Sequence, residues 1–268
     1  MAKYKKKRAR ELQQDRFRDT TMDFFDRLGD ALTGKGWTIL YGLGAFIIAA
    51  ALVMAFVKWR QKKANEAQQA LGRAITISST MVLANPVAGT SEPTFSSEKE
   101  RAQRAIDEFQ KVAAKYGDPY RSEAQYFIAT NRLVLDRQKA MSELAELSNS
   151  GVPEVAALSK FALAQANESD GKLDDAAKLY SELAKQNSPS VTQEIANLRL
   201  AKVYEKQGKK KEAADLLFNL VDASRKAKGP DNLPLPTSSA AREAADQLRK
   251  LDPDRYAQLP AENNFLAG

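Results

Sequence analysis

The hydrophobic pattern of the chain begins with one uninterrupted apolar run. Residues 37–57, WTILYGLGAFIIAAALVMAFV, form 21 consecutive positions without a charge. A helix of this length rises about 30 Å, which matches the hydrocarbon core of a bilayer. Trp37 and Tyr41 lie at one end and Trp59 just beyond the other, where aromatic rings are expected among the headgroups. The pattern predicts one transmembrane helix over residues 37–57, in contact with the lipid bilayer.

Downstream of this run, apolar residues recur at helical spacing in a repeated unit. Four segments each begin with Ala, which is followed four positions later by a large apolar residue and three positions after that by another. The intervals between the leading alanines are 35, 36 and 37 residues. A nearly constant period of this length predicts one helical unit repeated along the chain. The segments are AIDEFQKV from Ala105, AMSELAEL from Ala140, AAKLYSEL from Ala176 and AADLLFNL from Ala213.

A second helix is expected before each of the last two segments. It carries a small residue, Ala164 or Ala201, and ends near Gly171 or Gly208, where a left-handed backbone costs least. This helix–turn–helix unit resembles the tetratricopeptide repeat. The resemblance implies an all-α fold with one transmembrane helix followed by a tetratricopeptide-like α-solenoid of about four helix pairs. The unit led by Ala140 departs from the pattern because it lacks the turn glycine.

Proline-rich stretches and changes in charge divide the chain into four parts. Residues 11–33 of the leader place apolar side chains at helical spacing, so the leader is either an amphipathic helix or a solvated segment. Two stretches rich in Pro, Gly, Ser and Thr predict loops inside the repeat domain. The expected parts are a basic cytoplasmic leader (1–36), the span (37–57), a repeat domain (64–251) with loops at 85–97 and 228–239, and a mobile tail (252–268).

The net charge of +7 comes from both flanks of the span. Residues 1–36 hold ten Lys/Arg against six Asp/Glu, and KWRQKK at residues 58–63 adds four more positive charges. Residues 64–268 hold 27 Lys/Arg against 28 Asp/Glu. This balance predicts no nucleic-acid partner, because nucleic-acid-binding domains carry a basic surface.

The chain contains neither Cys nor His. Thiolate or imidazole metal sites, disulfides, Ser-His-Asp triads and Cys-His dyads are therefore excluded. No other catalytic constellation is visible in the sequence, so we expect no enzymatic activity, no catalytic or metal-binding residue and no cofactor.

Both flanks of the span are basic, so charge near the helix does not decide its orientation. A short, highly charged leader more usually stays in the cytoplasm, and long domains cross the membrane largely regardless of charge. We expect the N-terminus inside and the C-terminal domain outside. A cleaved signal peptide is the alternative, but KWRQKK stands where small residues should mark the cleavage site, so an uncleaved signal anchor is favoured.

The layout of leader, single span and repeats resembles single-span tetratricopeptide proteins of the bacterial inner membrane, the ancillary subunit family of the SecYEG translocon in particular. The resemblance implies a periplasmic C-terminal domain that binds translocon subunits, periplasmic chaperones or exported chains. The implied function is a membrane-anchored scaffold that assists protein translocation or periplasmic chaperone networks. The alternative is a structural homo-oligomer or a spacer in cell-envelope assembly.

In tetratricopeptide repeats, the inner surface comes mainly from the first helix of each pair. Positions in register with Phe127, Leu163 and Leu200 supply the candidates for a protein-binding groove. A solvated helix face is the other interpretation of the same pattern, since every solenoid exposes such residues. The candidate groove residues are Gln125, Arg132, Gln165, Glu168, Lys202, Glu205 and Lys206.

Overall fold

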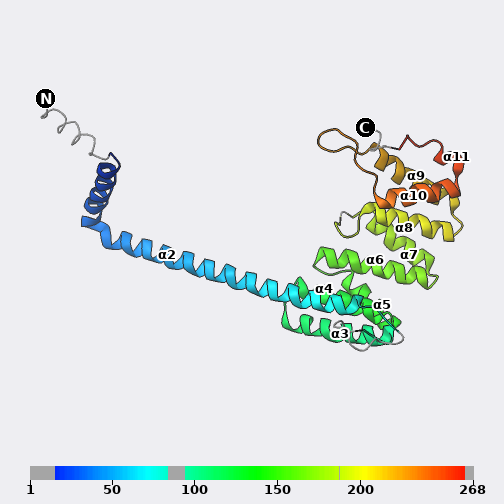
Figure 1. The fold of residues 1–268 in the computed structure, drawn as a ribbon, viewed down its shortest axis with the longest axis horizontal. Helices are drawn as coiled ribbons and strands as arrows, with labels where there is room; N and C mark the ends of the chain where they lie inside the picture. Colours follow the sequence, from blue (N-terminus) through cyan, green and yellow to red (C-terminus); the bar gives the residue numbers. More distant parts are fainter. Residues whose placement is uncertain (1–15, 84–93, 187, 263–268) are drawn as a thin grey trace, which may run out of the picture. The chain divides into compact units, whose positions relative to one another are not determined.

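The computed structural model describes residues 16–83, 94–186 and 188–262, and for residues 16–35 and Ile39 it describes the backbone only. Helices form this part of the chain, which contains two isolated β-bridges and no strand (Figure 1). The chain divides into two units, residues 1–65 and 66–268. The helices are α2 (Arg16–Ser79), α3 (Glu98–Lys115), α4 (Tyr120–Arg132), α5 (Arg137–Leu147), α6 (Pro153–Ser169), α7 (Leu173–Leu183), α8 (Gln193–Lys206), α9 (Lys210–Lys226), α10 (Ser239–Leu251) and α11 (Pro253–Tyr256).

The apolar run predicted as a span lies in α2. From Gly36 onward this helix is long and apolar enough to cross a membrane. The described large apolar side chains of residues 37–57 are exposed, with Trp37 at 73% and Phe46 at 72%. The backbone of residues 16–35 belongs to the same helix, and residues 1–15 of the predicted leader lie outside the described part.

The repeat unit is a series of helix pairs, as the period predicts. The pairs are the end of α2 with α3, α4 with α5, α6 with α7, and α8 with α9, and α10 packs on the last pair. The leading alanines of the four segments are completely buried, so each second helix packs closely on its neighbours. This all-α solenoid confirms the predicted fold class. The buried leading alanines are Ala105, Ala140, Ala176 and Ala213.

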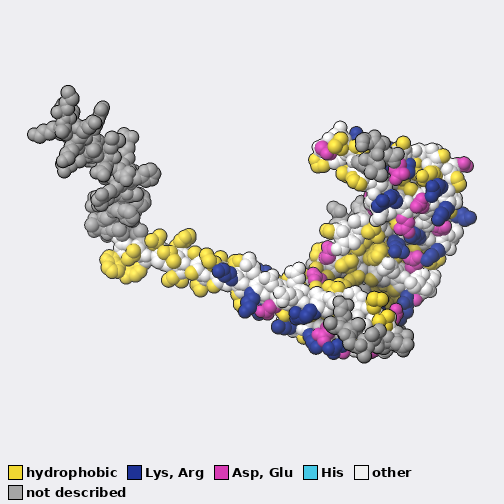
Figure 2. Space-filling view, in the orientation of Figure 1, with side chains coloured by type: hydrophobic (Ala, Val, Ile, Leu, Met, Phe, Trp, Pro, Cys, Tyr) yellow, Lys and Arg dark blue, Asp and Glu magenta, His cyan; other side chains and the backbone are white. Residues whose placement is uncertain are grey.

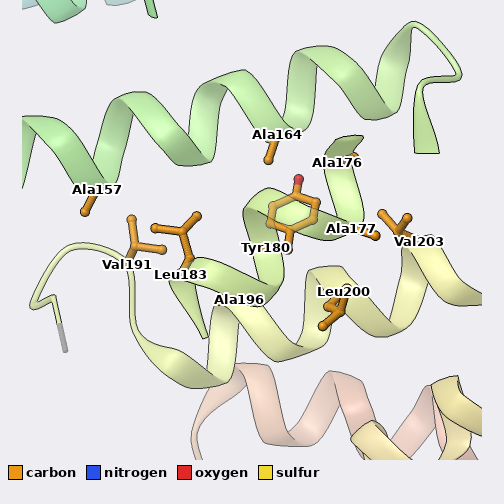
Figure 3. Packing of buried hydrophobic residues seen from close by; sticks show 10 residues of the cluster. All are labelled: Ala157, Ala164, Ala176, Ala177, Tyr180, Leu183, Val191, Ala196, Leu200 and Val203. Carbon is orange, nitrogen blue, oxygen red and sulfur yellow. The ribbon is translucent and has the colours of Figure 1, made fainter. Parts of the chain in front are cut away.

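The best-packed core lies between α6, α7 and α8 (Figure 3). Tyr180 and Leu183 project from α7 and are completely buried. Ala164 of α6 leaves room for the Tyr180 ring, and Leu200 and Val203 close the cluster from α8. The small and large residues of the repeat pattern therefore meet across the helices as the register requires.

The turns between paired helices use either a glycine with positive φ or a side-chain cap. Gly171 and Gly208 adopt positive φ angles of 72° and 77°, a conformation that other residues adopt only with strain. The α4–α5 turn lacks a glycine, and there the Asp136 carboxylate accepts a hydrogen bond from the Lys139 backbone N–H at 3.0 Å, which caps α5. Ser238 caps α10, since its hydroxyl accepts a hydrogen bond from the Ala241 N–H at 3.1 Å.

The first pair uses the last turns of α2 as its first helix. Leu71 and Ala74 of α2 pack with Phe109 of α3 in one buried cluster. The Ser78 hydroxyl donates to Asn131 Oδ1 at 3.0 Å, which joins α2 to α4. The connection to α3 contains the predicted 85–97 loop, and residues 84–93 of this connection lie outside the described part.

The C-terminal segment differs from the mobile tail expected over residues 252–268. Asp252 accepts a hydrogen bond from the Arg255 N–H at 3.0 Å and so starts α11. Tyr256 and Leu259 then pack against the α9–α10 cluster. The Asp252 cap directly after α10 starts this short helix, and the segment covers apolar surface of the α9–α10 cluster. Residues 263–268 of the predicted tail lie outside the described part.

Candidate protein-binding surface

The seven predicted groove residues lie on the first helices of three successive pairs. Gln125 and Arg132 belong to α4, Gln165 and Glu168 to α6, and Lys202, Glu205 and Lys206 to α8. In the structure Glu168 and Lys206 form an ion pair with each other, and the other five candidates take no part in it.

Glu168 lies at a junction of three helices. The buried Tyr180 hydroxyl of α7 donates to Glu168 Oε2 at 3.2 Å, and Lys206 Nζ of α8 donates to Oε1 at 2.5 Å. The Glu168 side chain is only 11% exposed. Burial, together with the Glu168 carboxylate, raises the pKa of the Tyr180 phenol, so this hydroxyl stays protonated and donates. Both carboxylate oxygens of Glu168 therefore accept hydrogen bonds from within the chain.

Two further groove residues connect α8 to α10. Lys202 Nζ donates to Glu243 Oε1 at 2.5 Å, and Glu205 Oε2 accepts from Gln247 Nε2 at 2.5 Å. Two of the seven candidates, Lys202 and Lys206, are lysines of α8. In the structure each lysine already has a carboxylate of this chain, on a different helix.

Arg132 forms an ion pair with Glu143 of α5. Its side chain is 14% exposed, so it lies between the two helices of its own pair. Gln125 is exposed and Gln165 is partly exposed, and within the described residues their side-chain amides make no hydrogen bond. Of the seven candidates, these two amides are the ones free to contact another molecule.

Apolar residues on the same helix faces were missed by the sequence reading. Leu158 and Phe161 of α6 are partly exposed, and Ile195 of α8 is 37% exposed. The Phe161 ring meets the Tyr180 ring edge-on at 5.7 Å, which fixes its position. Figure 2 shows hydrophobic surface in a hollow of the repeat unit, over α6 and α8. We call Leu158, Phe161 and Ile195 the apolar face.

Helical spacing could have identified the apolar face. Phe161 and Leu158 lie four and seven positions before Gln165, and Ile195 lies seven positions before Lys202. Residues at these spacings share one side of a helix. The predicted groove contained polar and charged residues only and therefore left out the apolar residues on the same side of each helix.

The described part of the surface offers hydrogen-bonding amides and apolar side chains. Among the residues that the structure describes, no group of three or more Asp or Glu is placed to hold a metal ion. Free amides beside exposed apolar side chains can instead hold a polypeptide, because they combine hydrogen-bonding groups with burial of apolar area.

No protein-family model matches the chain, and no curated protein matches it. A solved structure described as a kinesin light chain from Podosopora anserina with nearly identical TPR-like repeats is similar to it, with 20% sequence identity and a TM-score of 0.43. The similarity covers 57% of this chain and 79% of that one. The tetratricopeptide-like solenoid is therefore established by the helix pairs, the buried alanines and the turn glycines of this chain.

Proposed function

We propose that this chain is a membrane-anchored scaffold that holds other proteins against its repeat unit. The observation that carries the proposal is the apolar face, in which Leu158 and Phe161 of α6 are partly exposed and Ile195 of α8 is 37% exposed, on helices that also carry the free amide of Gln165. Burial of exposed apolar side chains supplies most of the free energy in protein association, and neighbouring polar groups supply orientation. The partner segment that suits this surface is apolar and uncharged, because the charged candidates are already paired.

The exposed apolar stretch of α2 supports the anchor. Residues 37–57 are charge-free, and their described large apolar side chains are exposed. Exposed apolar surface of this extent is stable in lipid and unfavourable in water. The location proposed is the bacterial inner membrane, with the N-terminus in the cytoplasm and the repeat unit in the periplasm. The partners proposed are translocon subunits, periplasmic chaperones or exported chains.

Crosslinking in the membrane tests the scaffold. A photo-crosslinking amino acid is placed at Phe161 or Gln165 on the proposed surface, and at the exposed Lys178 of α7 as the matched control. Capture of translocon subunits or exported chains from Phe161 and Gln165, at much higher yield than from Lys178, is the expected result. Equal yields from both faces contradict the surface. Capture of this chain alone favours the homo-oligomer.

A further inference from the structure

Four basic residues directly follow the apolar stretch of α2. Lys58, Arg60, Lys62 and Lys63 are all exposed, and we call them the basic belt. The nearest acidic residues in sequence are Asp30, several helical turns before the belt, and Glu66, which lies one turn after Lys62 and Lys63 in the same helix. Figure 2 shows these basic side chains as the first charges after the hydrophobic segment.

The belt covers somewhat more than half of the helix circumference rather than one narrow stripe. Each residue advances the helix by about 100°, so Lys58 and Lys62 lie on one side, Arg60 on the opposite side, and Lys63 between them. From Lys58 to Lys63 the helix rises only about 7.5 Å. The four charges of the belt therefore lie within a narrow range of depth along the helix axis, as a planar layer of headgroups requires.

Trp59 marks that depth. Its ring lies 6.1 Å from the ring of Phe56 within the apolar stretch, and Lys63 Nζ lies 4.2 Å from the centre of the Trp59 ring on the other side. Tryptophan prefers the boundary between hydrocarbon and headgroups. The belt therefore begins where phosphate groups are found.

The belt is not explained by topology. Basic residues keep their flank on the cytoplasmic side, so a belt after the span opposes the orientation proposed for this chain. We propose that the basic belt binds the phosphate groups of anionic phospholipids. The inference rests on the proposed membrane anchor. Arg60 can grip a phosphate with two parallel N–H groups, and the lysines supply point charges around it.

Fluorescence quenching in vesicles tests the proposal with the full chain. A Trp37→Phe variant leaves Trp59 as the sole tryptophan, since the chain has two. It is reconstituted into mixed phosphatidylcholine and phosphatidylglycerol vesicles in which either lipid carries brominated acyl chains. Trp59 quenching per brominated lipid is expected to be roughly twofold or more higher for phosphatidylglycerol.

Charge variants identify the groups responsible. Changing Lys58, Arg60, Lys62 and Lys63 together to Gln is expected to equalise quenching by the two lipids. The matched control changes Lys209, Lys210 and Lys211 to Gln, which removes a basic run from an exposed turn of the repeat unit, and the preference should survive. A preference that persists in the belt variant, or disappears equally in the control, overturns the proposal.

Three further outcomes distinguish failure of the belt from failure of the membrane anchor. If inorganic phosphate lowers the preference and chloride at equal ionic strength does not, the belt recognises the phosphate group itself, which supports the proposal. If neither brominated lipid quenches Trp59, the apolar stretch is not in the bilayer, and the membrane anchor fails together with the belt. Equal quenching by both lipids in the parent chain overturns the belt and leaves the anchor in place.

Discussion

Glu168 of α6 and Lys206 of α8 are joined at 2.5 Å although 38 positions separate them in the chain. The two residues stand near the ends of the first helices of successive pairs, so their bond links one repeat directly to the next. The Glu168 carboxylate also accepts a hydrogen bond from the hydroxyl of Tyr180, whose side chain is completely buried. Removal of Glu168 and removal of Lys206 therefore have different costs.

We expect Glu168→Ala to lower the free energy of unfolding by about 1–3 kcal/mol, because it leaves the buried Tyr180 hydroxyl without an acceptor. Lys206→Met should cost less than about 1 kcal/mol, since the Lys206 side chain is 54% exposed and its ion pair is screened by solvent. Urea denaturation of the full chain in detergent, followed by circular dichroism, measures both. Equal losses in the two variants would contradict the role of the tyrosine.

The buried alanines leave no space for a larger side chain. Ala176→Leu and Ala213→Leu should each lower the free energy of unfolding by about 1–3 kcal/mol through overpacking. Ala223→Leu is the matched control, because Ala223 lies on the exposed side of α9. Thermal denaturation compares the three variants. A melting temperature unchanged at both Ala176 and Ala213 would show that the repeat register is wrong.

The turn glycines are required for their backbone conformation and not for space. A Cβ at Gly171 or Gly208 meets nothing within 4 Å, yet both residues have positive φ. Gly171→Ala and Gly208→Ala should each cost about 1–2 kcal/mol of stability from the left-handed conformation alone. Gly151→Ala is the control, since its Cβ also meets nothing within 4 Å and its φ is not in this region. Urea denaturation of the four proteins checks the ranking, and a loss at Gly151 as large as at Gly171 would refute the explanation.

Stability should fall at high pH because of Tyr180. Burial raises the pKa of this phenol, so above about pH 10 the unfolded chain loses the proton while the folded chain keeps it. The contribution is fully present below pH 10 and declines by ~1.4 kcal/mol per pH unit above it. Tyr180→Phe should flatten this decline between pH 9 and pH 11, as measured by urea denaturation. The same slope in both proteins would assign the loss to other groups.

The orientation proposed for the chain predicts the activity of fused reporters. A reporter that works only outside the cytoplasm, fused after Gly268, should be active in bacterial cells. A reporter that works only in the cytoplasm, fused at the same place, should be silent. The reverse pair of results from well-expressed fusions would place the repeat unit in the cytoplasm.

Local pattern was sufficient to predict the fold because each repeat makes most of its contacts with itself and its neighbours. The spacing from Ala176 to Tyr180 and Leu183 predicted three residues that are all completely buried. Gly171 likewise predicted the turn that the structure contains. These features depend on spacing within one helix pair, which the sequence displays directly.

The pairing of charged side chains could not be predicted in the same way. Lys202 meets Glu243, 41 positions away, only because of the angle at which α8 and α10 pack. A spacing rule that finds the exposed face does not reveal which of its charges are neutralised by the next helix. The candidate surface therefore combined residues that bind internally with the two amides that remain free, Gln125 and Gln165.

The internal pairing of Glu168, Lys202 and Lys206 has a kinetic consequence. Long-range attraction accelerates encounters only when a surface presents unbalanced charge. The repeat unit is nearly neutral, and its lysines on this face are already paired, so a partner would find it by unaided diffusion and docking. We expect association rates that change little with salt, in the ordinary range of about 10⁵–10⁶ M⁻¹s⁻¹. Confinement to the membrane surface would then supply the local concentration that electrostatic steering does not.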